Sequence, residues 1–239
     1  MTKKPTIVFV HGAFTDASAW NGVSARLQDM GYSTLAPAVP LRSFNADAEY
    51  LSAYLAKIDG PMVLVGHSYG GSLISHPAVG RHCVQALVFV AAFVPDAGES
   101  MGELNGRFPG SQLGDATTIL REHPGGNDLY LRTEHFSGVY AADLPDPVVA
   151  LMAASQRPLN VTALSEVFEG EPTWRHLPSW TVIATADQSL PAEAQRFMAE
   201  RAGSVITEIS ASHALPLSQP GSVAEVIAAA ATGAAESAE

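Results

Sequence analysis

The five residues Gly66-His-Ser-Tyr-Gly70 follow directly on the apolar run Met62-Val-Leu-Val65, and this junction constrains the fold more than any other feature of the sequence. They match the pattern G-x-S-x-G in its strand-then-helix context, where a sharp and strained turn presents the serine hydroxyl above a sheet. Glycine at positions 66 and 70 leaves room for the strand and the next helix to cross closely. The pattern predicts Ser68 as a nucleophile, against the alternative of a glycine-rich turn that only packs a helix on a strand.

Short apolar runs rich in valine and isoleucine recur along the chain, and we predict each of them to be a buried strand. They span residues 6–10, 33–36, 62–65, 86–91, 181–185 and 204–209. Segments with helical spacing of apolar residues lie between them, as at Leu51, Tyr54, Leu55 and Ile58. This alternation predicts an α/β fold with a mostly parallel sheet of about six strands flanked by helices.

The alternation stops between residues 97 and 179, where glycine and proline are frequent. Several short helical segments can be identified there, but no convincing buried strand. A chain of 239 residues suits one α/β domain with an insertion. We therefore predict a hydrolase-like core formed by residues 1–96 and 180–239, with residues 97–179 inserted as a helical cap (lid) over the sheet edge.

A serine hydroxyl needs a neighbouring imidazole to take its proton, and a carboxylate to orient that imidazole. In this type of fold the order along the chain is serine, acid, histidine, each at the C-terminal end of a strand. Of the eight histidines, His213 alone follows the last predicted strand. Asp187 follows the penultimate strand and is favoured as the acid, and Asp96, after the strand at 86–91, is the alternative.

Acyl transfer also needs two backbone N–H groups that stabilise the oxyanion of the tetrahedral intermediate. One comes from the residue after the nucleophile, which is Tyr69, and the other from the loop after the first strand, which predicts Ala13. His11 and Gly12 allow that loop to turn sharply. We interpret His11 as a residue that braces the loop, not as a proton carrier.

Charge and cysteine content exclude several classes of partner. The chain has 13 Lys and Arg against 24 Asp and Glu, a net charge of −11, which disfavours both nucleic acid and a membrane surface as partners. Residues 1–5 run directly into the first strand, so we expect no secretory leader. The single Cys83 fits a reducing cytoplasm, and no clustered Cys/His spacing indicates a metal site. We expect a cytoplasmic enzyme without metal or organic cofactor.

Taken together, these residues resemble the α/β-hydrolase superfamily, and within it the small branch that contains plant methylesterases, hydroxynitrile lyases and related bacterial esterases. The resemblance spans most of the chain and is weakest in the cap. The segments that carry it are His11-Gly-Ala-Phe14 with Trp20, Gly66-His-Ser-Tyr-Gly-Gly71, Val88-Phe-Val-Ala-Ala-Phe-Val-Pro-Asp96, Asp187 with Gln195-Arg-Phe197, and Ser212-His213.

Within that branch, the lyases resemble esterases but carry a threonine after the first strand and a lysine directly after the catalytic histidine. Gly12 and Ala214 occupy those positions here. Because the ammonium group that holds the leaving cyanide is absent, the resemblance implies ester hydrolysis. Related dehalogenases and epoxide hydrolases carry aspartate at the elbow, and Ser68 excludes their alkyl-enzyme chemistry.

The sequence indicates the substrate less clearly than the reaction. Phe14, Phe93 and Leu215 neighbour the predicted site in sequence and are candidates for an apolar wall around a small hydrophobic or aromatic ester, although ordinary core packing explains them equally well. Two other functions stay open: a receptor-like protein that binds a ligand without turnover, and a tailoring enzyme for lactone opening, acyl transfer or cofactor-free oxygenation. A monomer and a homodimer both fit.

Overall fold

A six-stranded parallel sheet forms the centre of the computed structural model, which describes residues 4–236. In chain order its strands are β1 (Thr6–Val10), β2 (Thr34–Leu35), β3 (Met62–His67), β4 (Val84–Val90), β8 (Ser179–Ala184) and β9 (Val205–Ile209). They lie in the spatial order β2-β1-β3-β4-β8-β9. All residues of β1 and β3 are buried, as expected for central strands that helices cover on both faces. The predicted fold class is confirmed.

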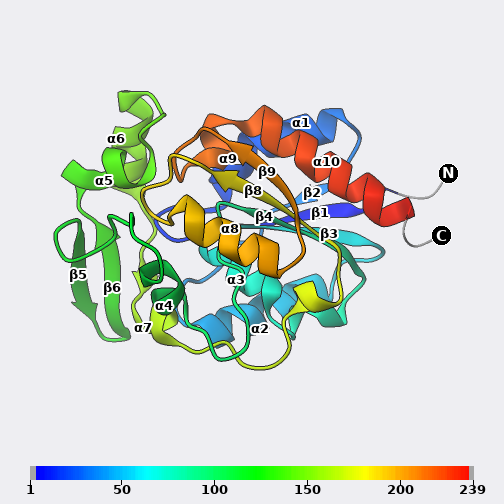
Figure 1. The fold of residues 1–239 in the computed structure, drawn as a ribbon, viewed down its shortest axis with the longest axis horizontal. Coiled ribbons are helices and arrows are strands. Elements are labelled where there is room, and N and C mark those ends of the chain that lie inside the picture. The colour runs from blue at the N-terminus through cyan, green and yellow to red at the C-terminus, as the bar shows by residue number, and fades with distance from the viewer. Residues whose placement is uncertain (1–3, 237–239) are drawn as a thin grey trace.

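Helices cover the two faces of the sheet in two groups (Figure 1). On one face, α1 (Asn21–Asp29), α9 (Leu215–Ser218) and α10 (Pro220–Glu236) enclose an apolar core that includes Trp20 and Ile227. On the other face, α2 (Phe44–Leu55), α3 (Tyr69–Ser75) and α8 (Ala192–Arg201) share a larger core with the cap. The 3-10 turns η1 (Ala17–Trp20) and η2 (Val79–Arg81) belong to the core, and η3 (Thr173–Arg175) lies at the end of the segment inserted between β4 and β8. None of the helices within residues 4–236 has both the length and the apolar character needed to cross a membrane.

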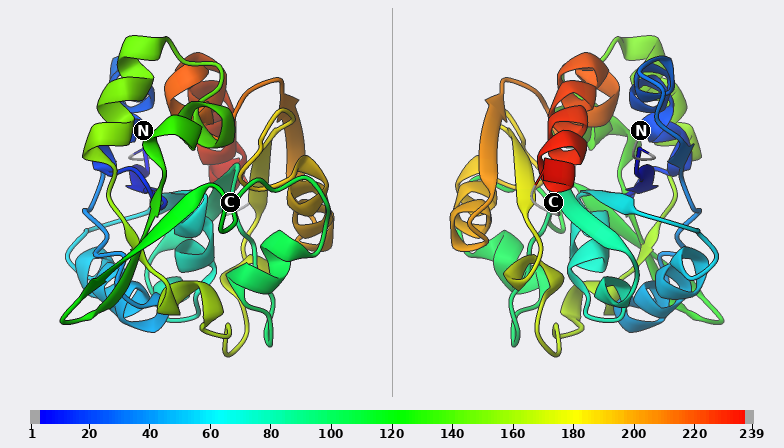
Figure 2. Two further views of the ribbon diagram at one scale, coloured as in Figure 1. Left: turned by 90° about the vertical axis from the view of Figure 1, so that its left-hand side faces the viewer. Right: turned by 90° about the vertical axis from the view of Figure 1, so that its right-hand side faces the viewer.

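The segment inserted between β4 and β8 is a mixed cap at one end of the sheet, and it faces the viewer in the left panel of Figure 2. Its helices are α4 (Met101–Gly106), α5 (Thr133–Tyr140), α6 (Asp146–Ser155) and α7 (Thr162–Ser165). Between them, β5 (Thr118–His123), β6 (Gly126–Leu131) and β7 (Leu159–Asn160) pair as an antiparallel sheet. The cap was expected to be helical, and besides its helices the structure has this small sheet. Of β5 and β6 only Leu131 is buried, and charged residues interrupt both strands, so the buried-strand signal is missing there.

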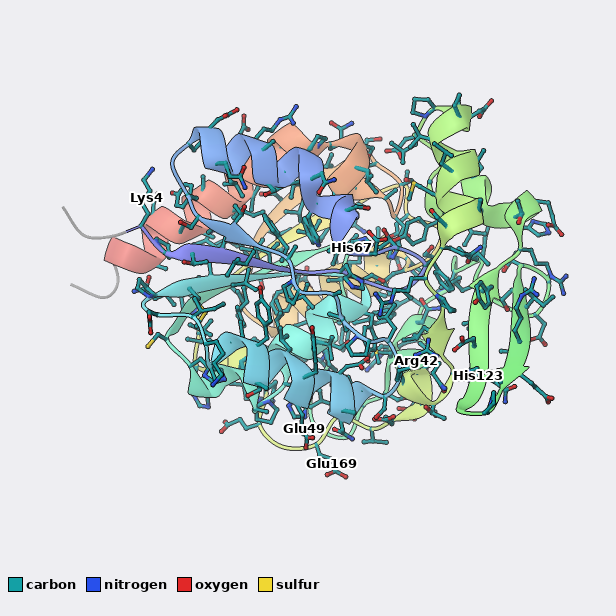
Figure 3. All side chains as sticks on the ribbon, turned by 180° about the vertical axis from the view of Figure 1, so that it is seen from behind. Lys4, Arg42, Glu49, His67, His123 and Glu169 are labelled. Carbon is teal, nitrogen blue, oxygen red and sulfur yellow. The ribbon has the colours of Figure 1, made fainter. Side chains whose placement is uncertain are left out.

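Arg42 connects the core to the cap hairpin. Its guanidinium donates to the Asp128 carboxylate of β6 at 2.6 Å and to the carbonyl oxygen of Pro158 at 3.0 Å. His123 of β5 lies beside the same carboxylate, and Figure 3 shows Arg42 and His123 together at this junction. The cap is therefore tied to the loop between β2 and α2 as well as to its own two ends.

Candidate active site

Ser68, Asp187 and His213 follow strands β3, β8 and β9, and all three residues are buried. Since the strands are parallel, their C-terminal ends share one edge of the sheet, where open α/β folds place their sites. Ser68 and His213 line the same cavity.

Ser68 sits on a strained elbow between β3 and α3. Its backbone angles are φ 53° and ψ −122°. Residues other than glycine rarely adopt this conformation, which costs roughly 1–3 kcal/mol. Two glycines make the elbow possible. A Cβ atom at Gly70 would lie 2.2 Å from the carbonyl oxygen of Val10, and one at Gly12 would lie 2.7 Å from the Cβ of Ser68. The predicted strained turn is present.

Asp187, and not Asp96, contacts His213. The Nδ1–H of His213 donates to Oδ2 of Asp187 at 2.6 Å, and both side chains are almost fully buried. This bond fixes Nδ1 as the protonated nitrogen and leaves Nε2 as the basic one. Asp96 instead forms an ion pair with Arg175, at 2.5 Å, on a partly exposed surface.

Gln195 holds the acid in place, a role that sequence reasoning did not assign. Its Nε2 donates to Oδ2 of Asp187 at 2.9 Å and to the carbonyl oxygen of Leu190, while its Oε1 accepts the N–H of Ala184. Oδ1 of Asp187 accepts the N–H groups of Ser189 and Leu190 at 2.7 and 3.0 Å. Four donors thus converge on one buried carboxylate.

The backbone around His213 is held from two sides. In the core, the Nε2–H of His67 donates to the carbonyl oxygen of His213 at 2.8 Å, and Figure 3 shows His67 deep inside the molecule. From the cap, the carbonyl oxygen of Tyr140 accepts the N–H of Ala214 at 2.9 Å. The core therefore anchors the backbone of His213, and the cap anchors the backbone of Ala214.

The cap also binds the residue before His213. The carboxylate of Asp143, in the link between α5 and α6, accepts the N–H of Ser212 at 3.1 Å and also the hydroxyl of Ser212. Partial burial by itself raises the pKa of Asp143, but its hydrogen bonds together outweigh burial and hold the pKa below its usual value. Nothing in the local sequence around Asp143 indicated this contact, because the two segments are distant along the chain.

The two predicted oxyanion donors both have a free N–H group. Among residues 4–236, no acceptor is present for the N–H of Ala13 or of Tyr69. The N–H of the next residue, Phe14, is used by the carbonyl oxygen of Arg157 at 2.8 Å. Both Ala13 and Tyr69 line the cavity that also contains Ser68.

Two buried histidines near the site are neutral, which makes stability depend on pH. Burial lowers the pKa of His11 to about 4, and burial followed by the nearby His213 lowers the pKa of His67 well below its usual value. In the unfolded chain both histidines take up a proton below about pH 6.5, whereas in the folded protein they stay neutral to a lower pH. For both side chains the contribution to stability is therefore complete above about pH 6.5 and declines as the pH falls below that value. For His11 the decline ends near its folded pKa of about 4.

We expect the free energy of unfolding to fall by about 1.4 kcal/mol per pH unit for each of these histidines below pH 6. Urea unfolding between pH 7.5 and pH 4.5 measures this slope. His11→Gln should reduce the slope, and substitution of the exposed His135 by Gln should leave it unchanged. A free energy of unfolding that is constant across this range would contradict the neutral burial of both side chains.

The cavity beside Ser68 has a volume of about 290 Å³ and a mostly apolar wall. Phe14 and Phe93 line it, but Leu215 does not: it is fully buried on the opposite face of the sheet, against α1 and α10. The chain turns into α9 directly after His213, so Leu215 is sequence-adjacent to the site without facing it. Other apolar lining residues are Met101, Leu113, Leu129, Leu159, Leu164 and Leu190.

Most of these additional lining residues come from the cap, where no periodic pattern of apolar residues marks them. The polar side chains in the wall, besides those already described, are Asn105, Thr118 and Ser189. Among the side chains that the structure describes, no lysine or arginine lines the cavity. Within residues 4–236, no group of three or more His, Cys, Asp or Glu side chains has the arrangement of a metal site.

Comparison with known proteins identifies the family of the chain. The model of the alpha/beta hydrolase family matches residues 7–226, so the chain belongs to that family. Within the family it falls in the methylesterase-like branch. It is 28% identical to Esterase PIR7B of Oryza sativa subsp. japonica over 95% of both chains, and 26% identical to Methylesterase 1 of Arabidopsis thaliana over 82% of this chain and 83% of the relative. The predicted family is confirmed.

Solved structures show the same fold at low identity. The crystal structure of polyneuridine aldehyde esterase has a TM-score of 0.80 and 22% identity, covering 95% of this chain and 99% of that one. A pyrethroid hydrolase from Sphingobium faniae JZ-2 has a TM-score of 0.78 and 23% identity, covering 97% and 99%. At these identities the likeness establishes the fold and not the substrate.

Proposed function

We propose that this protein hydrolyses a small hydrophobic or aromatic carboxylic ester through an acyl-enzyme on Ser68. The observation that carries the proposal is the buried bond between His213 and Asp187 beside a cavity that His213 shares with a strained Ser68. The esterases among its relatives support an ester as the substrate class.

The reaction consists of two acyl transfers. Nε2 of His213 takes the proton of Ser68 as Oγ attacks the ester carbonyl carbon, and the negative charge that develops on the carbonyl oxygen is stabilised by the N–H groups of Ala13 and Tyr69. The intermediate collapses, and the alcohol leaves with the proton from His213. Water then gives a proton to His213 and attacks the acyl carbon, so that the acid is released and Ser68 recovers its proton.

Size and polarity of the cavity support a small uncharged substrate. A volume of about 290 Å³ lies at the lower end of the range for small-molecule sites, roughly 300–1,000 Å³. Without a cationic side chain in the wall, a strongly anionic substrate would lose its hydration and gain no partner. Aliphatic and aromatic esters of modest length meet both conditions.

A fluorophosphonate probe followed by peptide mapping tests the nucleophile, and a p-nitrophenyl ester series from acetate to decanoate tests the pocket. We expect the label on Ser68 and rates that fall sharply at long acyl chains. Many turnovers per enzyme would exclude a receptor without turnover. One ¹⁸O atom in the acid product from labelled water would exclude acyl transfer to another acceptor and oxygenation. A label on a different residue, or no turnover of any ester, would overturn the proposal.

A further inference from the structure

The two backbone N–H groups assigned to the oxyanion come from segments far apart in the sequence, but both segments are connected to one partly buried loop, one through His11 and the other through Asp47. This loop comprises residues 39–42, between β2 and α2, and we call it the bracing loop. Val39 and Leu41 are fully buried, and Leu41 has a strained φ of 61°. Because a strained, buried conformation persists only where its surroundings fix it, this loop is a rigid element.

His11 connects the bracing loop to the Ala13 side of the site. Its Nε2 accepts the N–H of Val39 at 3.0 Å, so the proton of the neutral ring is on Nδ1, which donates to the carbonyl oxygen of Gly12 at 3.0 Å. That carbonyl belongs to the same planar peptide unit as the N–H of Ala13, and in a trans peptide the two groups point in opposite directions. The hydrogen bond from His11 therefore fixes the direction of the Ala13 N–H.

Asp47 connects the bracing loop to the Tyr69 side. The phenol hydroxyl of Tyr69 donates to Oδ2 of Asp47 at 2.8 Å, and the same oxygen accepts the backbone N–H of Arg42 at 3.2 Å. Asp47 and Tyr69 are each only 1% exposed. Since Tyr69 is the first residue of α3, anchoring its side chain fixes the start of the helix, where its own N–H is free.

The cap holds the bracing loop from the outside. The carbonyl oxygen of Leu41 accepts the N–H of Asn160 at 2.9 Å, and the guanidinium of Arg42 binds Asp128 at 2.6 Å. The loop therefore has fixed contacts to both oxyanion segments and to β6 and β7. Asp47 itself does not line the cavity.

We propose that Asp47 is a positioning residue for the oxyanion hole, acting through the Tyr69 hydroxyl and the bracing loop. The inference rests on the proposed function, because it assigns a role to a group that supports the Ser68 reaction. Asp47 and the Tyr69 hydroxyl do not react with the substrate. They hold the Tyr69 N–H so that it and the Ala13 N–H both point to the position that the oxyanion takes.

Tyr69→Phe and Asp47→Asn test this inference, with Tyr54→Phe in α2 as the matched control. Tyr69→Phe keeps the aromatic ring and the backbone N–H and removes only the bond to Asp47. We expect kcat for a p-nitrophenyl ester to fall on the order of 10-fold with KM within about twofold, a smaller loss than the 10²–10³ that follows removal of an oxyanion donor. Tyr54→Phe should retain wild-type kcat.

Affinity for a trifluoromethyl ketone distinguishes positioning from general destabilisation, because its adduct with Ser68 carries the oxyanion. We expect this affinity to fall by the same factor as kcat in Tyr69→Phe and Asp47→Asn, while affinity for the alcohol product stays unchanged. In the double variant the losses should be less than additive, since both substitutions weaken the same bond between Tyr69 and Asp47.

The inference is overturned if both variants match Tyr54→Phe in kcat and in ketone affinity while Ser68→Ala is inactive. Additive losses in the double variant would also overturn it. Should Tyr69→Phe fail to fold, Asp47→Asn carries the test alone, because it keeps the size of the side chain and removes one of the two acceptor oxygens that Arg42 and Tyr69 use. A wild-type protein that turns over no ester would instead remove the proposed function on which the inference depends.

Discussion

Replacement of Ser68 by alanine is expected to reduce ester turnover to the background rate, a loss of about 10⁶-fold in kcat, as for other serine hydrolases that lose the nucleophile. Without Oγ no acyl-enzyme forms, and His213 has no proton to accept in the first step. The remaining donors still bind the ester, so KM should change little. Initial rates with p-nitrophenyl acetate at high enzyme concentration measure the loss.

Ser72→Ala is the matched control for this substitution. Ser72 lies on the same helix, α3, and its buried hydroxyl has no hydrogen-bond partner among residues 4–236. Its removal should leave the rate unchanged. Ser68→Ala should unfold at the same temperature as the wild type, because both residues face the same backbone strain at φ 53°. Activity of Ser68→Ala within tenfold of the wild type would remove the nucleophile assignment.

Asp187→Asn should have the second-largest effect, a fall of about 10⁴-fold in kcat. Both oxygens of Asp187 accept two hydrogen bonds, so in either orientation the amide NH₂ of asparagine faces donors. Gln195 cannot turn to compensate, since its oxygen already accepts the N–H of Ala184. His213 would then adopt the tautomer with the proton on Nε2 and lose its basic nitrogen towards Ser68.

Asp96→Asn serves as the control, because it removes a similar charge after a neighbouring strand. Its ion pair with Arg175 is partly exposed, and such pairs contribute about 0–1 kcal/mol. Wild-type kcat is expected for Asp96→Asn, with thermal unfolding recorded for both variants. If Asp96→Asn lost activity and Asp187→Asn kept it, the assignment of the acid would be reversed.

The four central strands were predictable from the sequence because they are buried on both faces. The edge strands β2 and β9 were located as well, but the expectation that they are buried was wrong, since each has a neighbour on one side only. Runs such as residues 62–65 and 86–91 are continuously apolar, and this pattern is visible in a single sequence. The cap strands were missed for the opposite reason. In β5 the charged residues Arg121 and Glu122 are exposed, so neither an apolar run nor a clear alternation marks the strand.

The residues of the site that directly follow a strand were predictable, because the ends of the strands determine where those residues lie. Ser68, Asp187 and His213 each follow a strand of one parallel sheet, so their order alone brings them to one edge. Leu215 was placed wrongly at the cavity, because the direction of a side chain after a turn does not follow from its neighbours. Asp47 and Asp143 were missed, since each contacts a segment distant in sequence.

In this chain the cap cannot change freely without affecting the position of His213. Tyr140 and Asp143 bond the residues on either side of His213, so a cap transplanted from a relative would misplace the imidazole unless this junction travelled with its partners Ser212 and Ala214. The wall residues contributed by α4 and the hairpin carry no such constraint. Selection for new esters is therefore free to act on those wall positions, while the α5–α6 link is held constant by the reaction itself.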